Sequence, residues 1–176
     1  SAMDARGSSR YTLDVKVDSQ NLVSRLEIKA YGEASTTPTA HAIVAIVDDS
    51  VFAQVGTGIQ RAETKVGAIP WVNPSFALLQ VLVQRARRLG KGPATIPLFL
   101  IEGGKTVSAT VTRLGADSTI VEVGGAELRL NTSSNGEVLG GAVPAQHSEI
   151  VRHTIPYSAK GVALAKPDYS APANAP

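Results

Sequence analysis

Alternating hydrophobic and polar residues mark the first part of the chain. An alternation of period two places the apolar side chains on one face of a β-strand. Turn-forming residues at 18–21 separate two segments of this kind, so the pattern predicts a β-hairpin. The apolar positions of the two segments are Tyr11, Leu13, Val15, Val17, Leu22, Leu26 and Ile28.

A second pair of short apolar segments follows. Residues 42–47 are aliphatic, Asp48-Asp49-Ser50 forms a polar break, and residues 51–55 are largely apolar again. This arrangement predicts another hairpin, preceded by a loop over 33–39. A further strand is expected around residues 60–66.

One segment has the three- and four-residue spacing of an amphipathic helix. We expect this helix over residues 73–89, with Asn73 as its N-cap, Pro74 in its first turn and Gly90 ending it. The basic residues near its end suit the negative pole of the helix dipole and are expected to be solvated. The apolar stripe consists of Phe76, Leu79, Leu82, Val83, Ala86 and Leu89, and the polar side of Gln80, Gln84, Arg87 and Arg88.

The second half of the chain returns to strands separated by short turns rich in glycine, aspartate and asparagine. Connections this short suit antiparallel hairpins, because parallel strands need long crossovers. The expected strands are 95–101, 107–113, 119–123, 126–130, 137–143 and 149–155. The predicted fold class is therefore α+β, mostly antiparallel, with a curved sheet or half-barrel around the one main helix.

The domain organisation follows from these elements. Residues 1–9 are polar and begin with Ser-Ala-Met, which is typical of an expression remnant. Residues 10–157 are expected to form one β-rich domain with a single core. Residues 158–176 contain several prolines among small residues and are expected to be a linker or tail.

Composition excludes several functions. The chain of 176 residues has a net charge of +2 without a basic stripe, so nucleic acid is not expected as a partner. The absence of cysteine excludes disulfides and thiolate chemistry. No apolar run is long enough for a transmembrane segment.

Catalytic motifs are absent from the sequence. No Gly-x-Ser-x-Gly elbow occurs, and Gly56-Thr57-Gly58 lacks the third glycine of a dinucleotide-binding turn. His41, His147 and His153 have no carboxylate at an informative spacing, and a zinc site built from the three is a weak alternative. We therefore expect no catalytic residues, no metal and no cofactor.

The strongest candidate for ligand binding is the apolar segment just before the helix, which contains the only tryptophan of the chain. Trp71, Phe76 and Leu79 are the predicted ligand-binding residues, on the view that a sheet curling around the helix leaves an apolar cavity. The alternative is that this segment only fastens the helix to the sheet.

Two resemblances add to this picture. Antiparallel strands, one amphipathic helix and more antiparallel strands resemble the half-barrel of bacterial lipoprotein carriers, which implies a lipid ligand. Three segments resemble the β-rich N-terminal domain of secreted serine aminopeptidase-like α/β-hydrolases: Asn73-Pro74-Ser75-Phe76 with Leu78–Leu82, Ala109–Arg113, and Pro167–Pro176. That resemblance implies that a catalytic domain follows.

The sequence thus leads to one expected function and two alternatives. We expect a non-catalytic accessory or binding domain, periplasmic or secreted, which is the N-terminal module of an exported bacterial hydrolase. One alternative is a free-standing periplasmic carrier of a lipid or other apolar ligand. The other is an enzyme with an unfamiliar site of histidines and acids.

Overall fold

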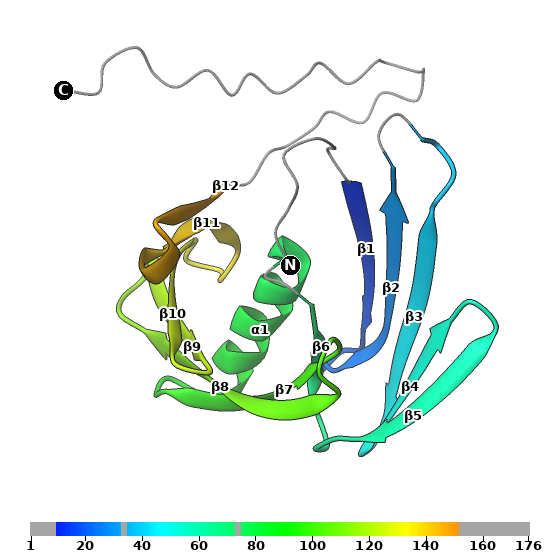
Figure 1. Cartoon of the computed structure of the whole chain (residues 1–176). Helices are drawn as coiled ribbons and strands as arrows, with labels where there is room; N and C mark the ends of the chain where they lie inside the picture. Colours follow the sequence, from blue (N-terminus) through cyan, green and yellow to red (C-terminus); the bar gives the residue numbers. More distant parts are fainter. Residues whose placement is uncertain (1–9, 33–34, 73–74, 152–176) are drawn as a thin grey trace, which may run out of the picture.

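The computed structural model describes residues 10–32, 35–72 and 75–151. Two sheets, one of five and one of seven strands, make up this part of the chain. The larger sheet curls around helix α1 as a half-barrel, and the smaller sheet stands on the other side of the helix (Figure 1). This arrangement confirms the predicted α+β class with a curved, mostly antiparallel sheet.

The five-stranded sheet is an antiparallel meander in which each strand pairs with the next one along the chain. Both predicted hairpins of the first part are confirmed, with their turns at 18–21 and 48–49. The strands are β1 (Arg10–Val17), β2 (Val23–Tyr31), β3 (Ala40–Val47), β4 (Ser50–Val55) and β5 (Gly58–Glu63). Gly56 and Thr57 form the β4–β5 turn, so this glycine-containing segment is a tight hairpin turn.

The seven-stranded sheet contains the predicted meander of the second half. Successive strands from β7 to β12 pair antiparallel, with bounds within a few residues of those expected, except that residues 152–155 of the last expected strand lie outside the described residues. The strands are β6 (Ile69–Trp71), β7 (Ala94–Leu100), β8 (Lys105–Arg113), β9 (Ser118–Val123), β10 (Ala126–Thr132), β11 (Val138–Val143) and β12 (Ser148–Val151), with a short 3₁₀ helix, η1 (Pro144–Gln146), before β12.

One pairing differs from the antiparallel pattern. Strand β6 pairs parallel with β7, and α1 (Phe76–Leu89) is the crossover between them. The apolar segment before the helix is therefore itself a strand at the edge of the sheet. Its three residues are all buried, which is typical of a strand in a parallel pair.

The helix begins later than its sequence suggests. Ser75 is the N-cap, and its hydroxyl accepts a hydrogen bond from the backbone N–H of Leu78 at 3.2 Å. The assignment of Asn73 as N-cap was therefore wrong, because serine fills the same role two residues later. Asn73 and Pro74 themselves lie outside the described residues.

Part of the polar side of α1 is hydrogen-bonded to the protein, and the rest is exposed to solvent. Gln80 and Gln84 donate hydrogen bonds to the β10–β11 turn, and Arg87 donates to the carbonyl oxygen of Ser134 at 2.6 Å. Arg88 is exposed as expected. Two guanidinium nitrogens of Arg85 are buried instead, so the expectation that the basic cluster of Arg85, Arg87 and Arg88 is solvated was wrong for Arg85.

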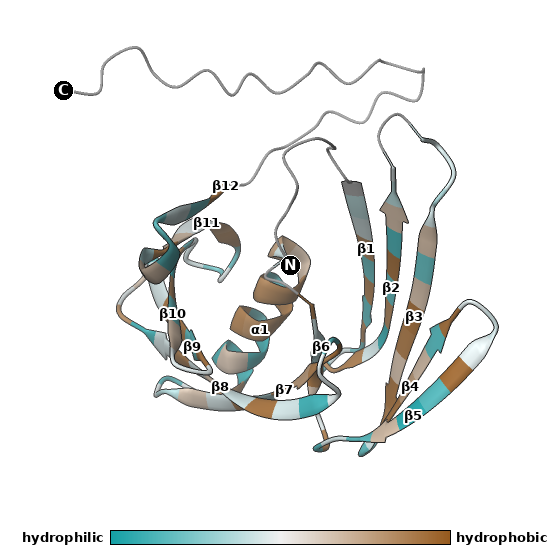
Figure 2. Cartoon of the chain, viewed as in Figure 1, coloured by the Kyte–Doolittle hydropathy of each residue, from teal (hydrophilic) through white to brown (hydrophobic). Residues whose placement is uncertain are grey.

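A single apolar core lies between α1 and the concave face of the half-barrel, and it extends to the near end of the five-stranded sheet. Brown colouring marks much of the helix and alternates with teal along the strands (Figure 2). The large side chains buried most completely are Leu26, Ile69, Leu78, Leu79, Leu82, Ile96, Leu98 and Leu130. No helix in the described ranges is long and apolar enough to cross a bilayer.

Candidate functional site

The five-stranded sheet has one aliphatic face, which is organised in cross-strand rows. Strand register aligns these residues directly opposite one another on neighbouring strands. We name three rows by their order from one end of the sheet: the first row is Tyr11, Ala30 and Ala40; the second row is Leu13, Ile28, Ala42 and Val55; and the third row is Val15, Leu26, Val44 and Ala53.

Burial changes along this aliphatic face. In the third row, Leu26 and Val44 are fully buried against the core. In the second row, Leu13 and Ile28 are only half-buried, and Val55 is 62% exposed. Tyr11 in the first row is 59% exposed. The core thus covers one end of the aliphatic face and leaves the first two rows partly open to solvent.

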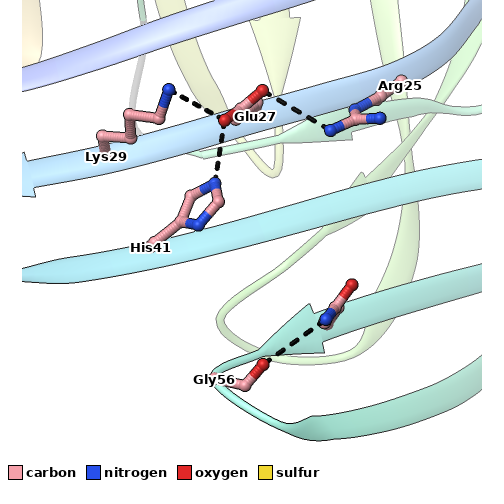
Figure 3. Close-up of polar contacts among 6 residues, drawn as sticks. Arg25, Glu27, Lys29, His41 and Gly56 are labelled. Atoms are coloured by element: carbon pink, nitrogen blue, oxygen red, sulfur yellow. Dashed lines mark hydrogen bonds and ion pairs between the residues drawn. The ribbon is translucent and has the colours of Figure 1, made fainter.

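The opposite face of the same sheet carries a cluster of ionisable side chains. The carboxylate of Glu27 lies 2.9 Å from Lys29 Nζ, 2.8 Å from His41 Nε2 and 3.5 Å from a guanidinium nitrogen of Arg25 (Figure 3). Arg25, Glu27 and Lys29 alternate along β2, while His41 lies opposite Lys29 on β3. The register of the sheet therefore brings all four side chains to one face.

This cluster shifts the ionisation of two of its members. The hydrogen bond from Lys29, followed by that from His41, lowers the pKa of Glu27 below its usual value of 4.5. The same hydrogen bond raises the pKa of Lys29 above 10.5. Glu27 therefore stays ionised in mildly acidic solution and holds the neighbouring cations in place.

A pocket of about 370 Å³ adjoins this cluster between β1 and β2. Its polar lining combines acceptors and donors of both charges: Thr12, Asp14, Glu27, Lys29 and Tyr31. Such a surface suits a small polar group better than an apolar chain. Leu13 and Val15, which belong to the second and third aliphatic rows, also line this pocket, so it is not confined to the polar face of the sheet.

The residues predicted to bind a ligand lie elsewhere, in the core. Trp71 is 8% exposed in β6, and its carbonyl oxygen accepts a hydrogen bond from the N–H of Ile101 at 3.1 Å. Leu79 is fully buried on α1, and Phe76 packs against the core at the start of the helix. All three side chains belong to the core or pack against it, and their role in binding a ligand stays a prediction.

The histidines do not share a site within the described part of the chain. His41 is on β3, whereas His147 follows η1 in the left-handed conformation, and His153 lies outside the described residues. His41 does have a carboxylate partner in the fold, Glu27, but the two residues lie 14 positions apart, at no spacing that the sequence marks. Residues 10–32, 35–72 and 75–151 contain no group of three side chains suited to a metal ion.

Comparisons with known proteins give little further information. No family model matches the chain, and no curated protein matches its sequence. A crystal structure of a DUF1089 family protein from Pseudomonas aeruginosa is similar over 81% of this chain and 94% of that one, with 14% sequence identity and a TM-score of 0.44. A similarity this low carries no argument about fold or function.

Proposed function

We propose that this domain is a non-catalytic binding module that holds a lipophilic ligand on the aliphatic face of the five-stranded sheet. The observation that supports the proposal is the change in burial along that face. An aliphatic surface that the core covers only in part, as at Leu13 and Ile28, is costly in water. An acyl chain or similar ligand on the first two rows would remove that cost.

The chemistry of the rows favours an apolar ligand over a polar one. Every side chain of the second row is aliphatic, and Tyr11 in the first row has the only polar atom among the side chains of both rows. Burying one methylene group of a ligand contributes about 0.8 kcal/mol. A chain laid across four strands would therefore gain its affinity from many small apolar contacts.

A matched pair of substitutions tests this location. Ala42 in the second row and Ala45 lie on the same strand, face opposite sides of the sheet and are both half-buried. We expect Ala42→Asp to abolish binding of a fluorescent fatty acid in titration, because it places a carboxylate in the aliphatic row. Ala45→Asp should bind as the unsubstituted protein does, and equal loss in both variants would refute the location.

Attachment to an exported hydrolase remains the broader proposal and rests on the resemblance of the sequence. The aliphatic rows give such a module a role, since they would retain a lipophilic substrate near a catalytic domain. Reading the gene beyond the codon for Pro176 tests this attachment. A stop codon at that point would refute it and favour a free-standing carrier.

A further inference from the structure

The open end of the five-stranded sheet presents hydrophobic and aromatic side chains to solvent. Val55 and Ile59 flank the β4–β5 turn and are 62% and 71% exposed. Tyr11 near the start of β1 is 59% exposed, and Tyr31 ends β2 at the same end of the sheet. We call Tyr11, Tyr31, Val55 and Ile59 the rim. The first two aliphatic rows lead directly to it.

The geometry of the β4–β5 turn restricts what the rim fits. Val55 pairs with Gly58, while Ile59 pairs with Gln54, so Val55 and Ile59 point to opposite faces of the hairpin. A flat protein surface would cover only one of these two side chains. A medium that surrounds the turn would cover both. The hairpin also stands away from the helix and the half-barrel, as Figure 1 shows.

The charges near the rim are mostly positive. Arg61 is the only ionisable side chain in residues 51–62, and its guanidinium donates a hydrogen bond to Ser50 Oγ, at the end of β4 away from the rim. On the polar face, the row nearest the rim is Thr12, Lys29 and His41, and it contains no carboxylate. Asp14 and Glu27 lie one row further along, in the same cross-strand row as Ile59, and the carboxylate of Glu27 already contacts Arg25, Lys29 and His41.

We propose that the rim docks on the surface of a lipid bilayer that contains anionic phospholipid. Val55 and Ile59 enter the boundary between headgroups and acyl chains, the tyrosines lie at headgroup level, and the cations face the anionic lipids. This inference rests on the proposed function in one respect: docking would open the aliphatic rows to the membrane, so that a lipophilic ligand passes between the two without crossing water.

Vesicle binding tests the proposal directly. The full chain is mixed with vesicles of phosphatidylcholine, alone or with phosphatidylglycerol, and bound protein is measured by co-sedimentation. We expect stronger binding to the anionic vesicles than to phosphatidylcholine alone. The double variant Val55→Asp/Ile59→Asp should lose about tenfold or more in affinity, because two aliphatic side chains that the bilayer would bury are replaced by carboxylates, which the anionic lipids repel. Absence of vesicle binding by the unsubstituted protein would overturn the proposal.

Val47 provides the matched control. It is 58% exposed, but it lies at the other end of β3 from the rim. Val47→Asp should bind anionic vesicles as strongly as the unsubstituted protein, and circular dichroism should show that all variants are folded. Equal loss in Val47→Asp and in the double variant would mean that charge alone, and not the rim, decides binding.

Two further measurements separate docking from ligand binding and from self-association. Titration with a fluorescent fatty acid in the absence of vesicles should be unaffected by Ile59→Asp alone, because Ile59 faces away from the aliphatic rows, whereas Val55 belongs to the second row. If the protein binds the fatty acid but not the vesicles, docking is refuted and the ligand proposal stands. If the protein binds the vesicles but not the fatty acid, only the ligand proposal is refuted. Sedimentation velocity that shows a dimer dependent on Val55 and Ile59 would overturn docking in favour of a second copy of the chain.

Discussion

The side-chain amide of Gln80 binds the β10–β11 turn with both of its ends: Nε2 donates to the carbonyl oxygen of Gly136 at 2.9 Å, and Oε1 accepts from the N–H of Val138 at 2.8 Å. Both contacts are partly buried, and they join residues more than fifty positions apart in the chain. This one glutamine therefore ties the helix to the far side of the half-barrel.

Replacing Gln80 by methionine should destabilise the domain by about 1–3 kcal/mol, because the substitution removes the partly buried hydrogen bond to the N–H of Val138 and leaves the carbonyl oxygen of Gly136 with Gln84 as its side-chain donor. Urea unfolding monitored by circular dichroism measures the change. Arg88→Met on the exposed side of the same helix is the control and should change stability by less than about 0.5 kcal/mol. Equal effects of the two substitutions would contradict the role assigned to the amide.

Gly136 should not tolerate a side chain. Its φ of +81° is in the left-handed region, and a Cβ at this position would overlap the side chain of Arg87. Gly124 has a φ of +56° but open space around it. We therefore expect Gly124→Ala to cost about 1–2 kcal/mol from backbone conformation alone. Gly136→Ala should cost more in thermal unfolding, because Arg87 must also move from Ser134.

The partly buried guanidinium of Arg85 carries a desolvation penalty. Its Nε and one terminal nitrogen are buried without a hydrogen-bond partner among the described residues, and burial lowers the pKa of its guanidinium. Arg85→Met should therefore keep or raise the free energy of unfolding, by up to about 1–3 kcal/mol, since it removes the desolvation penalty while retaining the apolar stem. A marked loss of stability in chemical denaturation would show that the charge is needed, with Asp18 as the nearby anion.

Glu27 should make the stability of the domain depend on pH. Its pKa is lowered by folding, so its contribution is present above the usual value of 4.5 and is lost as pH falls through the lowered pKa. The stability difference between the unsubstituted protein and Glu27→Gln should therefore be largest above pH 4.5 and shrink in more acidic solution. Glu102→Gln, at an exposed position in the β7–β8 turn, serves as control in the same series of denaturation curves.

Trp71 should matter for stability whether or not it contacts a ligand. Trp71→Ala removes a large buried side chain beside β7 and should cost about 3–5 kcal/mol. Tyr11→Ala, at an exposed aromatic position, should cost far less. If Trp71 also contacts the ligand, the milder Trp71→Phe variant should remain folded in calorimetry but bind the fluorescent fatty acid more weakly. Unchanged binding would leave Trp71 a purely structural residue.

The hairpins were predictable because two local signals agree in each of them. Period-two alternation marks the strands, and residues that favour left-handed or tight turns separate them, as Asp48 does with a φ of +54°. Strand β6 could not be predicted in this way, because a segment of three buried residues has no periodicity to detect. Its parallel partner, β7, is also brought to it by the helix rather than by a local turn.

The candidate site was less predictable than the fold. The contact between Glu27 and His41 depends on the register of β2 against β3, and the loop between these strands does not reveal that register. The open part of the aliphatic face was hidden for a different reason. The alternation predicts that Leu13 and Leu26 share a face, but only the position of the second sheet decides which of them is covered.

The exceptional pairing of β6 also bears on the order of folding. Each hairpin of the two meanders closes a loop of a few residues, so these strands can pair early and independently. Strand β6 has to await both α1 and β7, since its partner lies beyond the whole helix. The segment that carries the single tryptophan is therefore expected to join the native structure last, and its fluorescence would time the final step of folding.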